Sequence, residues 1–228
     1  MTSRESTLRS GASQLGLSLS EEQLRQLLTY LDLIAKWNKV YNLTAIRDPE
    51  EMLSQHLLDS LAAVPPLRRH LAGRPAHLLD VGSGAGLPGI VIAICCPEVA
   101  VDCVDTVGKK AAFIQQAAAQ LQLPNLRGLH DRVEKLTGPY DVICSRAFAS
   151  LADFVIWSGG ALAPDGAWMA MKGKRPDSEI EELPPATDVF HVEQLSVPGL
   201  TAERCIVWMR PHRAESNTGA DSNGVPRQ

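Results

Sequence analysis

Residues 77–90 have the sequence HLLDVGSGAGLPGI, and this stretch decides the fold. A short apolar run ends at Asp80-Val81, and glycines follow at Gly82, Gly84 and Gly86 before a second apolar segment begins. Glycine adopts backbone conformations that are closed to other residues and lets the chain approach a ligand closely. The pattern predicts a strand, a glycine loop and a helix, with Pro88 near the first helical position, where no amide hydrogen is needed.

The spacing of these glycines separates the families of nucleotide-binding proteins. The dinucleotide fingerprint G-x-G-x-x-G requires a third glycine at the position of Leu87, so a nicotinamide-dependent oxidoreductase is the least favoured interpretation. An acid, Asp80, followed by a G-x-G-x-G loop is similar to the first motif of class I S-adenosylmethionine-dependent methyltransferases. A glycine-rich turn in another α/β protein is the alternative that this motif alone leaves open.

Apolar runs typical of strands alternate with helical segments after the loop. Asp105 ends the run 101–105, about twenty residues after the loop, where a carboxylate can accept the ribose hydroxyls of a bound nucleotide. Capping of the helix that starts near Val107 is the alternative role for the same acid. A helix over 151–162 and a turn at Pro164-Asp165-Gly166 are also expected. The remaining strands are expected at 126–130, 140–145, 167–171, 188–195 and 204–210.

The carboxyl ends of the expected strands point to a single binding crevice. In open α/β sheets ligands bind beyond these ends, so side chains that follow the strands should lie close together. The residues that we expect to converge there are Asp80, Asp105, Val133-Glu134 and Arg146.

The chain before the glycine loop predicts a helical region. Residues 1–19 are polar and weakly patterned, whereas Ser20 and Gln23 form a capping box that precedes leucines at helical spacing. A second helix is expected after Asp48 as its cap, with Pro49 in its first turn.

Three polar residues share this second helix, at spacings that place side chains next to one another: His56, Asp59 and Ser60. One interpretation is a solvated face, or a histidine paired with a nearby carboxylate. The other is a patch that faces the substrate. No H-E-x-x-H motif or comparable ligand cluster accompanies them, so no metal site is predicted.

Proline and glycine between residues 64 and 76 break the helical pattern and suggest a division of the chain. We expect an N-terminal helical cap at 1–63 and a Rossmann-like α/β domain at 64–210. From Pro211 the sequence loses apolar residues, which predicts a disordered tail at 211–228.

Composition restricts the possible partners and the compartment. The net charge of −4 gives no sign of nucleic-acid binding, so an RNA partner would require local positive charge, for which residues 20–63 and 172–175 are the candidates. No signal peptide and no apolar stretch of ~18 residues is present, so neither export nor membrane insertion is expected. The five cysteines form no C-x-x-C pair and are interpreted as reduced core thiols of a cytosolic protein: Cys95, Cys96, Cys103, Cys144 and Cys205.

Several separate motifs together resemble one family, the bacterial small-subunit ribosomal RNA methyltransferase G family, also called glucose-inhibited division protein B. The resemblance covers about residues 20–210, and its most specific parts are the G-L-P-G continuation of the loop and the S-R-A-F-A segment. The matching pieces are Asn42-Leu43-Thr44, residues 56–61 (HLLDSL), residues 80–89 (DVGSGAGLPG), Asp105 with Lys109-Lys110, Arg132-Val133-Glu134, residues 145–149 (SRAFA) and Lys172-Gly173.

The resemblance implies a class I methyltransferase fold with a mostly parallel sheet of seven strands and an N-terminal helical extension. It also implies methyl transfer from S-adenosylmethionine to N7 of a guanine in 16S rRNA of the small ribosomal subunit, by a cytoplasmic and monomeric enzyme. His56, Asp59 and Lys172 are then possible substrate contacts. The implied cofactor contacts are Gly82, Gly84, Leu87, Val133, Glu134 and Arg146, together with Asp105.

The chemistry of the sequence fits this activity. Guanine N7 carries an in-plane lone pair and no proton, so attack on the sulfonium methyl needs positioning rather than a general base. A positive charge develops on the guanine, so we assign Arg146 to the methionine carboxylate or a phosphate rather than to N7. Cys144 lies within a strand and is a weak candidate for a nucleophile. Phe148 is expected to pack in the core rather than stack on a base.

Two other functions remain compatible with the sequence. One is a class I methyltransferase that acts on a small molecule or a protein. The other is a ribosome assembly factor that binds the cofactor without turnover.

Overall fold

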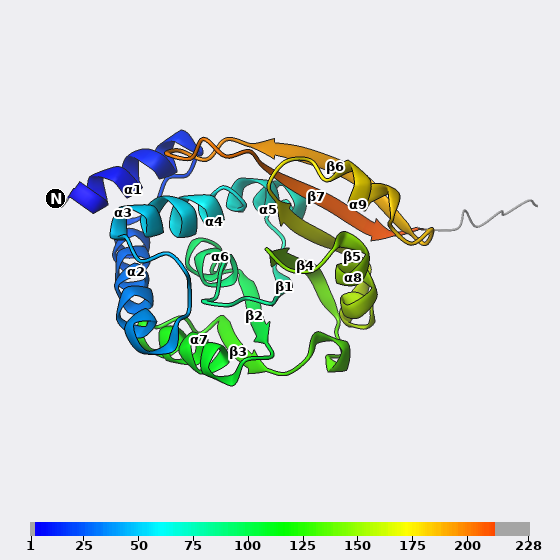
Figure 1. Ribbon diagram of the computed structural model, residues 1–228, viewed down its shortest axis with the longest axis horizontal. Coiled ribbons are helices and arrows are strands. Elements are labelled where there is room, and N and C mark those ends of the chain that lie inside the picture. Colours follow the sequence, from blue (N-terminus) through cyan, green and yellow to red (C-terminus); the bar gives the residue numbers. More distant parts are fainter. Residues whose placement is uncertain (1–2, 213–228) are drawn as a thin grey trace, which may run out of the picture.

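A mostly parallel sheet of seven strands forms the centre of the computed structural model, which describes residues 3–212 (Figure 1). The strand order is β3-β2-β1-β4-β5-β7-β6, in which the first five strands are parallel and β7 runs antiparallel to both β5 and β6. The strands are β1 (Ala76–Val81), β2 (Val99–Asp105), β3 (Leu126–His130), β4 (Tyr140–Arg146), β5 (Leu162–Lys172), β6 (Thr187–Leu195) and β7 (Arg204–Pro211). The prediction of fold class and strand number is confirmed.

The strand order reverses next to β1, which pairs with β2 on one side and β4 on the other. Such a switch point leaves a crevice beyond the carboxyl ends of the two strands, because their connections leave in opposite directions. The glycine loop follows β1 and therefore begins at this crevice.

The expected turn at Pro164-Asp165-Gly166 is wrong, because these residues lie inside β5. The strand begins at Leu162, and its register with β4 shifts between the pairs Tyr140–Leu162 and Val142–Ala167. A Cβ at Gly166 would lie 2.9 Å from the carbonyl oxygen of Tyr140, so the irregular stretch requires glycine there. A bulge therefore absorbs residues whose composition suggested a turn.

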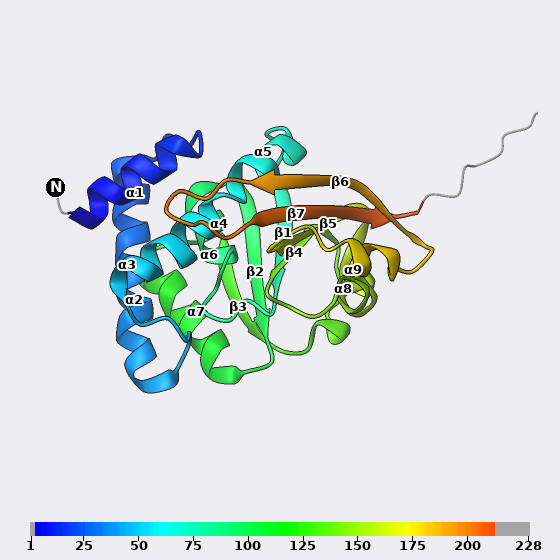
Figure 2. The ribbon, with the colours of Figure 1, turned by 45° about the horizontal axis from the view of Figure 1, so that its top comes forward.

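Helices cover both faces of the sheet, as Figures 1 and 2 show. Neighbouring residues of β1 point to opposite faces, so Leu78 joins one apolar cluster and Leu79 joins the other. The helices that follow the first strands are α6 (Gly89–Cys95), α7 (Gly108–Gln120), α8 (Leu151–Ser158) and α9 (Asp177–Glu181), with 3-10 turns at Val133–Lys135 and Gly159–Ala161.

The N-terminal region is helical from its first described residues. The helices are α1 (Ser3–Gln14), α2 (Glu21–Tyr41), α3 (Pro49–Met52), α4 (Asp59–Leu61) and α5 (Val64–Leu71), and a π-helical turn (Leu53–Leu58) joins α3 to α4. The capping box of α2 and the Asp48 cap of α3 are confirmed.

The polar stretch before Ser20 is helical, whereas the break expected at 64–76 is wrong. The polar stretch before Ser20 contains α1, whose few apolar residues, Leu8 and Ala12, are buried in the main core. The predicted break at 64–76 contains α5, because Pro65-Pro66 occupy its first turn, where a missing amide hydrogen costs nothing.

One apolar cluster joins the N-terminal helices to a face of the sheet, since it extends from Leu8 through Ile90 to Trp208. The division at residue 63 stays a prediction. At the other end, Pro211 belongs to β7 and His212 Nδ1 contacts Asp188 Oδ1 at 2.9 Å, so the predicted tail does not begin at Pro211. The rest of that prediction, 213–228, lies outside the described residues.

Candidate functional site

The glycine loop has the backbone that its sequence predicts. Gly82, Gly84 and Gly86 have φ angles of 67°, 59° and 86°, a region that side chains rarely adopt. A Cβ at Gly82 would lie 2.6 Å from Phe148 Cδ2, so this position is also sterically closed. At Gly84 the nearest atom to such a Cβ is a backbone oxygen 4.0 Å away, so the chain there borders open space that a ligand can enter.

Asp80 does not line the crevice, contrary to our expectation. Its side chain is fully buried, and Oδ2 accepts the backbone N–H of Gly89 at 2.9 Å, at the start of α6. Burial raises the pKa of this carboxyl to about 7. Asp80 therefore ties β1 to the helix that follows the loop.

Two adjoining hollows replace the single expected crevice, and Gly82 lines both. The cap-side hollow has a volume of about 470 Å³ and contains Leu87, Arg146 and Lys172. The β3-side hollow has a volume of about 720 Å³ and is lined by the other predicted cofactor residues, Asp105, Val133 and Glu134.

In the β3-side hollow, Asp105 connects β2 to the glycine loop. Oδ2 accepts the N–H of Gly84 at 3.0 Å, and Oδ1 accepts the N–H of Val107 at 2.8 Å. Val107 is the N-cap of α7 and its own side chain makes no capping bond, whereas Asp105 accepts its N–H, so the capping alternative stays open beside the ribose role. A carboxylate has about four acceptor sites, so both oxygens of Asp105 can still accept hydroxyl groups.

Aromatic side chains form another wall of the β3-side hollow. Phe148 and Trp157 both line it, and their rings meet edge to face with centroids 5.9 Å apart. Phe148 also packs against Phe154 of α8, at 6.2 Å, and against the apolar cluster on this face. Phe148 is thus partly buried, and its ring also lines the hollow, so its core role stays a prediction.

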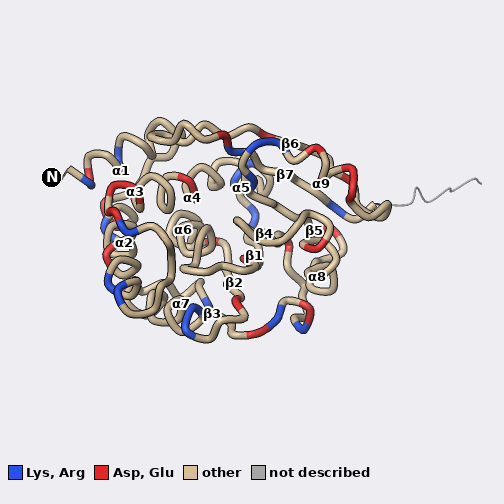
Figure 3. Tube along the Cα trace, viewed as in Figure 1, with Lys and Arg blue, Asp and Glu red and all other residues tan. Residues whose placement is uncertain are grey.

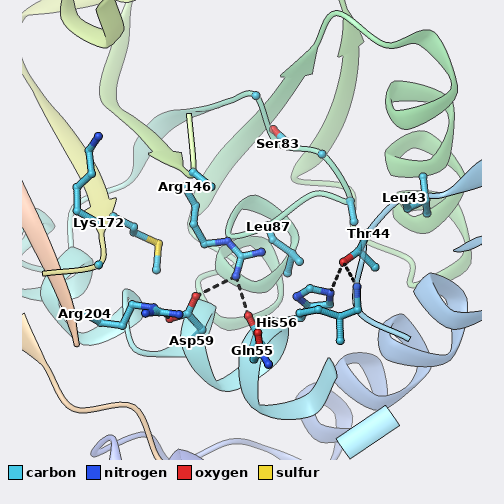
Figure 4. Close-up of a pocket in the computed structure, with 17 residues that line it drawn as sticks. Leu43, Thr44, Gln55, His56, Asp59, Ser83, Leu87, Arg146, Lys172 and Arg204 are labelled. Carbon is cyan, nitrogen blue, oxygen red and sulfur yellow. Dashed lines mark hydrogen bonds and ion pairs between the residues drawn. The ribbon is translucent and has the colours of Figure 1, made fainter. Parts of the chain in front are cut away.

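The cap-side hollow contains a buried ion-pair network that Figure 4 shows. Asp59 is 3% exposed; its Oδ2 accepts Arg146 Nη1 at 3.0 Å and its Oδ1 accepts Arg204 Nε at 2.8 Å. The solvated-face interpretation is therefore wrong for Asp59. Arg204 was missed in the sequence, although it starts a strand antiparallel to β5 and so lies at the carboxyl edge of the parallel strands.

The π-helical turn provides a second acceptor for Arg146. In an α-helix the N–H of Asp59 would bond the carbonyl of Gln55, four residues earlier. Here it bonds the carbonyls of Ser54 and His56 instead. The carbonyl of Gln55 accepts Arg146 Nη1 at 2.9 Å. The irregular helix therefore directs a backbone acceptor toward the end of β4.

His56 is buried beside this network. Its Nε2 lies 3.0 Å from Thr44 Oγ1, so it is neither solvated nor paired with a carboxylate (Figure 4). Burial, and then the nearby charge of Arg146, lower the pKa of His56 to about 4. The imidazole is neutral at pH 7, and its Nδ1 has no hydrogen-bond partner among the described residues.

Lys172 lines the same hollow but is already paired. Its Nζ donates to Glu179 Oε2 at 2.8 Å and to the carbonyl of Ala149 at 3.2 Å. Further along the predicted basic loop, Arg175 Nε donates to Asp177 Oδ1 at 2.6 Å. Two of the three positive charges of this loop, those of Lys172 and Arg175, are thus compensated by acids of α9.

Nucleophilic cysteine chemistry has no support at this site. All five cysteines are buried, and burial raises the pKa of the Cys144 thiol well above its usual value. Within residues 3–212 no group of three His, Cys, Asp or Glu side chains is arranged to hold a metal ion. No described helix is both long and apolar enough to cross a membrane.

The sheet order, the glycine loop after β1 and the acid at the end of β2 define a class I S-adenosylmethionine-dependent methyltransferase fold. Two solved structures share it. One is the 1,6-didemethyltoxoflavin-N1-methyltransferase of Burkholderia thailandensis, which was solved with S-adenosylhomocysteine. It is 15% identical, with a TM-score of 0.56, and the match covers 86% of this chain and 92% of that chain. The other is the N-methyltransferase NodS of Bradyrhizobium japonicum. It is 13% identical, with a TM-score of 0.56, and the match covers 78% of this chain and 100% of that chain.

The sequence comparisons identify the family within this class. A model of the rRNA small subunit methyltransferase G family matches residues 23–207. Proteins named "Ribosomal RNA small subunit methyltransferase G" are similar over almost the whole chain. The relative from Polaromonas sp. JS666 is 67% identical over 98% of this chain and all of its own length. The relative from Acidovorax sp. JS42 is 68% identical over 92% of this chain and 96% of its own length. This chain belongs to the rRNA small subunit methyltransferase G family.

Proposed function

We propose that the protein transfers a methyl group from S-adenosylmethionine to N7 of a guanine in 16S rRNA of the small ribosomal subunit. The observation that carries this proposal is the open glycine loop beside the Asp105 carboxylate, in a chain of this family. The proposal includes action as a monomer in the cytoplasm.

The residues around Gly82 fit the cofactor. Asp105 would accept the ribose hydroxyls, and Val133 and Glu134 would border the adenine in the β3-side hollow. Gly82 and Gly84 would let the backbone approach the cofactor, and Leu87 and Arg146 would contact it from the cap-side hollow. S-adenosylmethionine supplies a methyl group on a positively charged sulfur.

The charges of the cap-side hollow suit a nucleophile that carries no proton. Guanine N7 attacks with a lone pair, so the chain has only to hold the base and the methyl donor in line. The guanine becomes positively charged, and the neutral His56 adds no repulsion. The charge of Arg146 is compensated by Asp59, which supports its assignment to the methionine carboxylate or a phosphate rather than to N7.

RNA contacts are expected to be confined to small patches. Figure 3 shows that the positions of Lys and Arg and those of Asp and Glu are interspersed along the described chain, and the net charge is −4. We assign the contacts to the helical region 20–63 and to residues 172–175, with His56, Asp59 and Lys172 nearest the base. Specificity would then rest on the shape of a structured ribonucleoprotein rather than on overall charge.

The first test is incubation of the purified protein with labelled S-adenosylmethionine and small ribosomal subunits from a strain that lacks the enzyme. Nucleoside analysis should give a labelled 7-methylguanosine peak, and subunits from a strain that has the enzyme should give none. Cofactor binding without any methylated nucleoside would contradict the proposal and favour a small-molecule methyltransferase or a non-catalytic assembly factor.

A further inference from the structure

Tyr30 links the N-terminal helices directly to the glycine loop. It lies on α2 and is fully buried, and its hydroxyl donates a hydrogen bond of 2.6 Å to the carbonyl oxygen of Ala85. Its ring stacks against Phe113 of α7, with centroids 6.4 Å apart, which fixes the ring between the two helices. Burial raises the pKa of Tyr30 well above its usual value, so the hydroxyl keeps its proton and remains a donor.

The hydrogen bond acts on the middle of the glycine loop, at a carbonyl that no backbone group of the loop satisfies. At the start of the loop, Gly82 N–H bonds the carbonyl of Val104 in β2. Further on, the carbonyl of Ser83 accepts the N–H of Gly86 at 2.8 Å and that of Leu87 at 3.0 Å, which closes a turn. The middle consists of Ala85 between two glycines with positive φ. The turn leaves the N–H of Gly84 and the carbonyl of Ala85 without a partner inside the loop, so these two groups depend on contacts from outside it. Glycine restricts its neighbours little, so such contacts help to fix the conformation.

Two such contacts hold the middle of the loop, and they come from different elements. Asp105, at the end of β2, accepts the N–H of Gly84, and Tyr30, on α2, donates to the carbonyl of Ala85. The two bonds hold successive residues, and Gly84 is the residue that borders the open space.

We propose that Tyr30 is a positioning residue for the cofactor, because it holds the glycine loop in the conformation that the cofactor binds. The N-terminal helices then contribute to cofactor affinity as well as to RNA contact. This inference rests on the proposed function, in which S-adenosylmethionine binds at the loop.

The test is Tyr30→Phe in the full-length protein, which removes one oxygen and keeps the buried ring. The Kd for S-adenosylhomocysteine, measured by calorimetry, should rise about 5- to 10-fold, the value expected for one hydrogen bond. The KM for S-adenosylmethionine should rise by the same factor, while kcat should change less than about twofold, because the bond acts on binding and not on the reacting atoms.

Tyr140→Phe is the matched control. Tyr140 is also buried, and its hydroxyl donates to Asp102 Oδ2 at 2.8 Å, within the sheet and away from both hollows. This variant should lower Tm as Tyr30→Phe does and leave the Kd unchanged. An unchanged Kd in Tyr30→Phe, or an equal rise in both variants, would overturn the inference.

Hydrogen exchange separates this inference from the proposed function. Amides of residues 82–87 should exchange faster in Tyr30→Phe than in the wild type, and those in Tyr140→Phe should not. If the wild type failed to bind S-adenosylhomocysteine, the proposed function would be wrong, and the exchange rates would still decide whether Tyr30 holds the loop. Equal rates in all three proteins would show that it does not.

Discussion

The two hollows that meet at Gly82 are built in different ways. The cap-side hollow depends on charges from distant parts of the chain, since Asp59 joins Arg146 and Arg204. The β3-side hollow depends on one carboxylate, Asp105, held by backbone amides close to it in the fold, and on an aromatic wall. A mutation in the cap-side hollow should therefore damage the fold and the site together. A mutation in the β3-side hollow should mainly weaken cofactor binding.

The largest expected effect is that of Asp59→Ala, which tests whether the fold depends on the ion pairs of the cap-side hollow. Arg146 and Arg204, whose side chains are 20% and 24% exposed, would lose their shared carboxylate. Removing one partner of a buried ion pair is strongly destabilising, and the partial exposure reduces the loss here to about 2–3 kcal/mol of the free energy of unfolding. Urea denaturation measures it.

Asp59→Asn is the matched control, because it keeps the shape and one acceptor oxygen but removes the charge. Its stability should lie between those of the wild type and Asp59→Ala. If Asp59→Ala were as stable as the wild type, the network would be unimportant for the fold, and the two hollows would not differ in this way.

A second prediction concerns the pH dependence of the cap side. The pKa of His56 is about 4 in the folded chain and about 6.5 when the chain unfolds. Between these values only the unfolded chain takes up this proton, so the contribution of His56 to stability falls as pH decreases from about 6.5 to 4. The loss should reach at most about 3 kcal/mol, because each pKa unit corresponds to about 1.4 kcal/mol.

The measurement compares the wild type with His56→Gln at each pH, because Asp80 contributes with the opposite sign. Its pKa is raised to about 7, so the folded chain retains that proton and stability decreases as pH rises from about 4 to 7. Subtracting the two curves removes the contribution of Asp80. A difference that does not vary between pH 4 and 6.5 would contradict the assignment of a low pKa to His56.

Of these three predictions, Asp105→Ala has the smallest expected effect, and it tests the β3-side hollow. Loss of the ribose acceptor and of the bond to Gly84 should weaken S-adenosylhomocysteine binding about tenfold, which is about 1.4 kcal/mol. Asp131→Ala removes another acid that lines the same hollow and should leave the affinity nearly unchanged. Equal affinity of Asp105→Ala and the wild type by calorimetry would refute the ribose role.

The parts of the molecule that follow from local sequence could be predicted. Three glycines at alternate positions after an apolar run require positive φ angles, and Asp105 follows from the strand that it ends. The parallel sheet follows from buried apolar runs that alternate with helices. The capping residues Ser20 and Asp48 act over two or three neighbouring positions, so their roles were also visible.

The parts that depend on packing could not be predicted. Nothing near Asp59 in the sequence indicates Arg204, which reaches it across 145 positions. Helix α1 has few apolar residues and is stabilised by tertiary contacts of Leu8 and Ala12. The division of the crevice into two hollows likewise depends on where the N-terminal helices pack against the sheet.

The π-helical turn makes the site sensitive to the number of residues in the N-terminal helical region. A π turn holds more residues than an α turn, so deleting one residue within Leu53–Leu58 would restore regular α-helix. The carbonyl of Gln55 would then bond within the helix. Relatives or designed variants that lack one residue of this turn would therefore lose the acceptor that Arg146 uses.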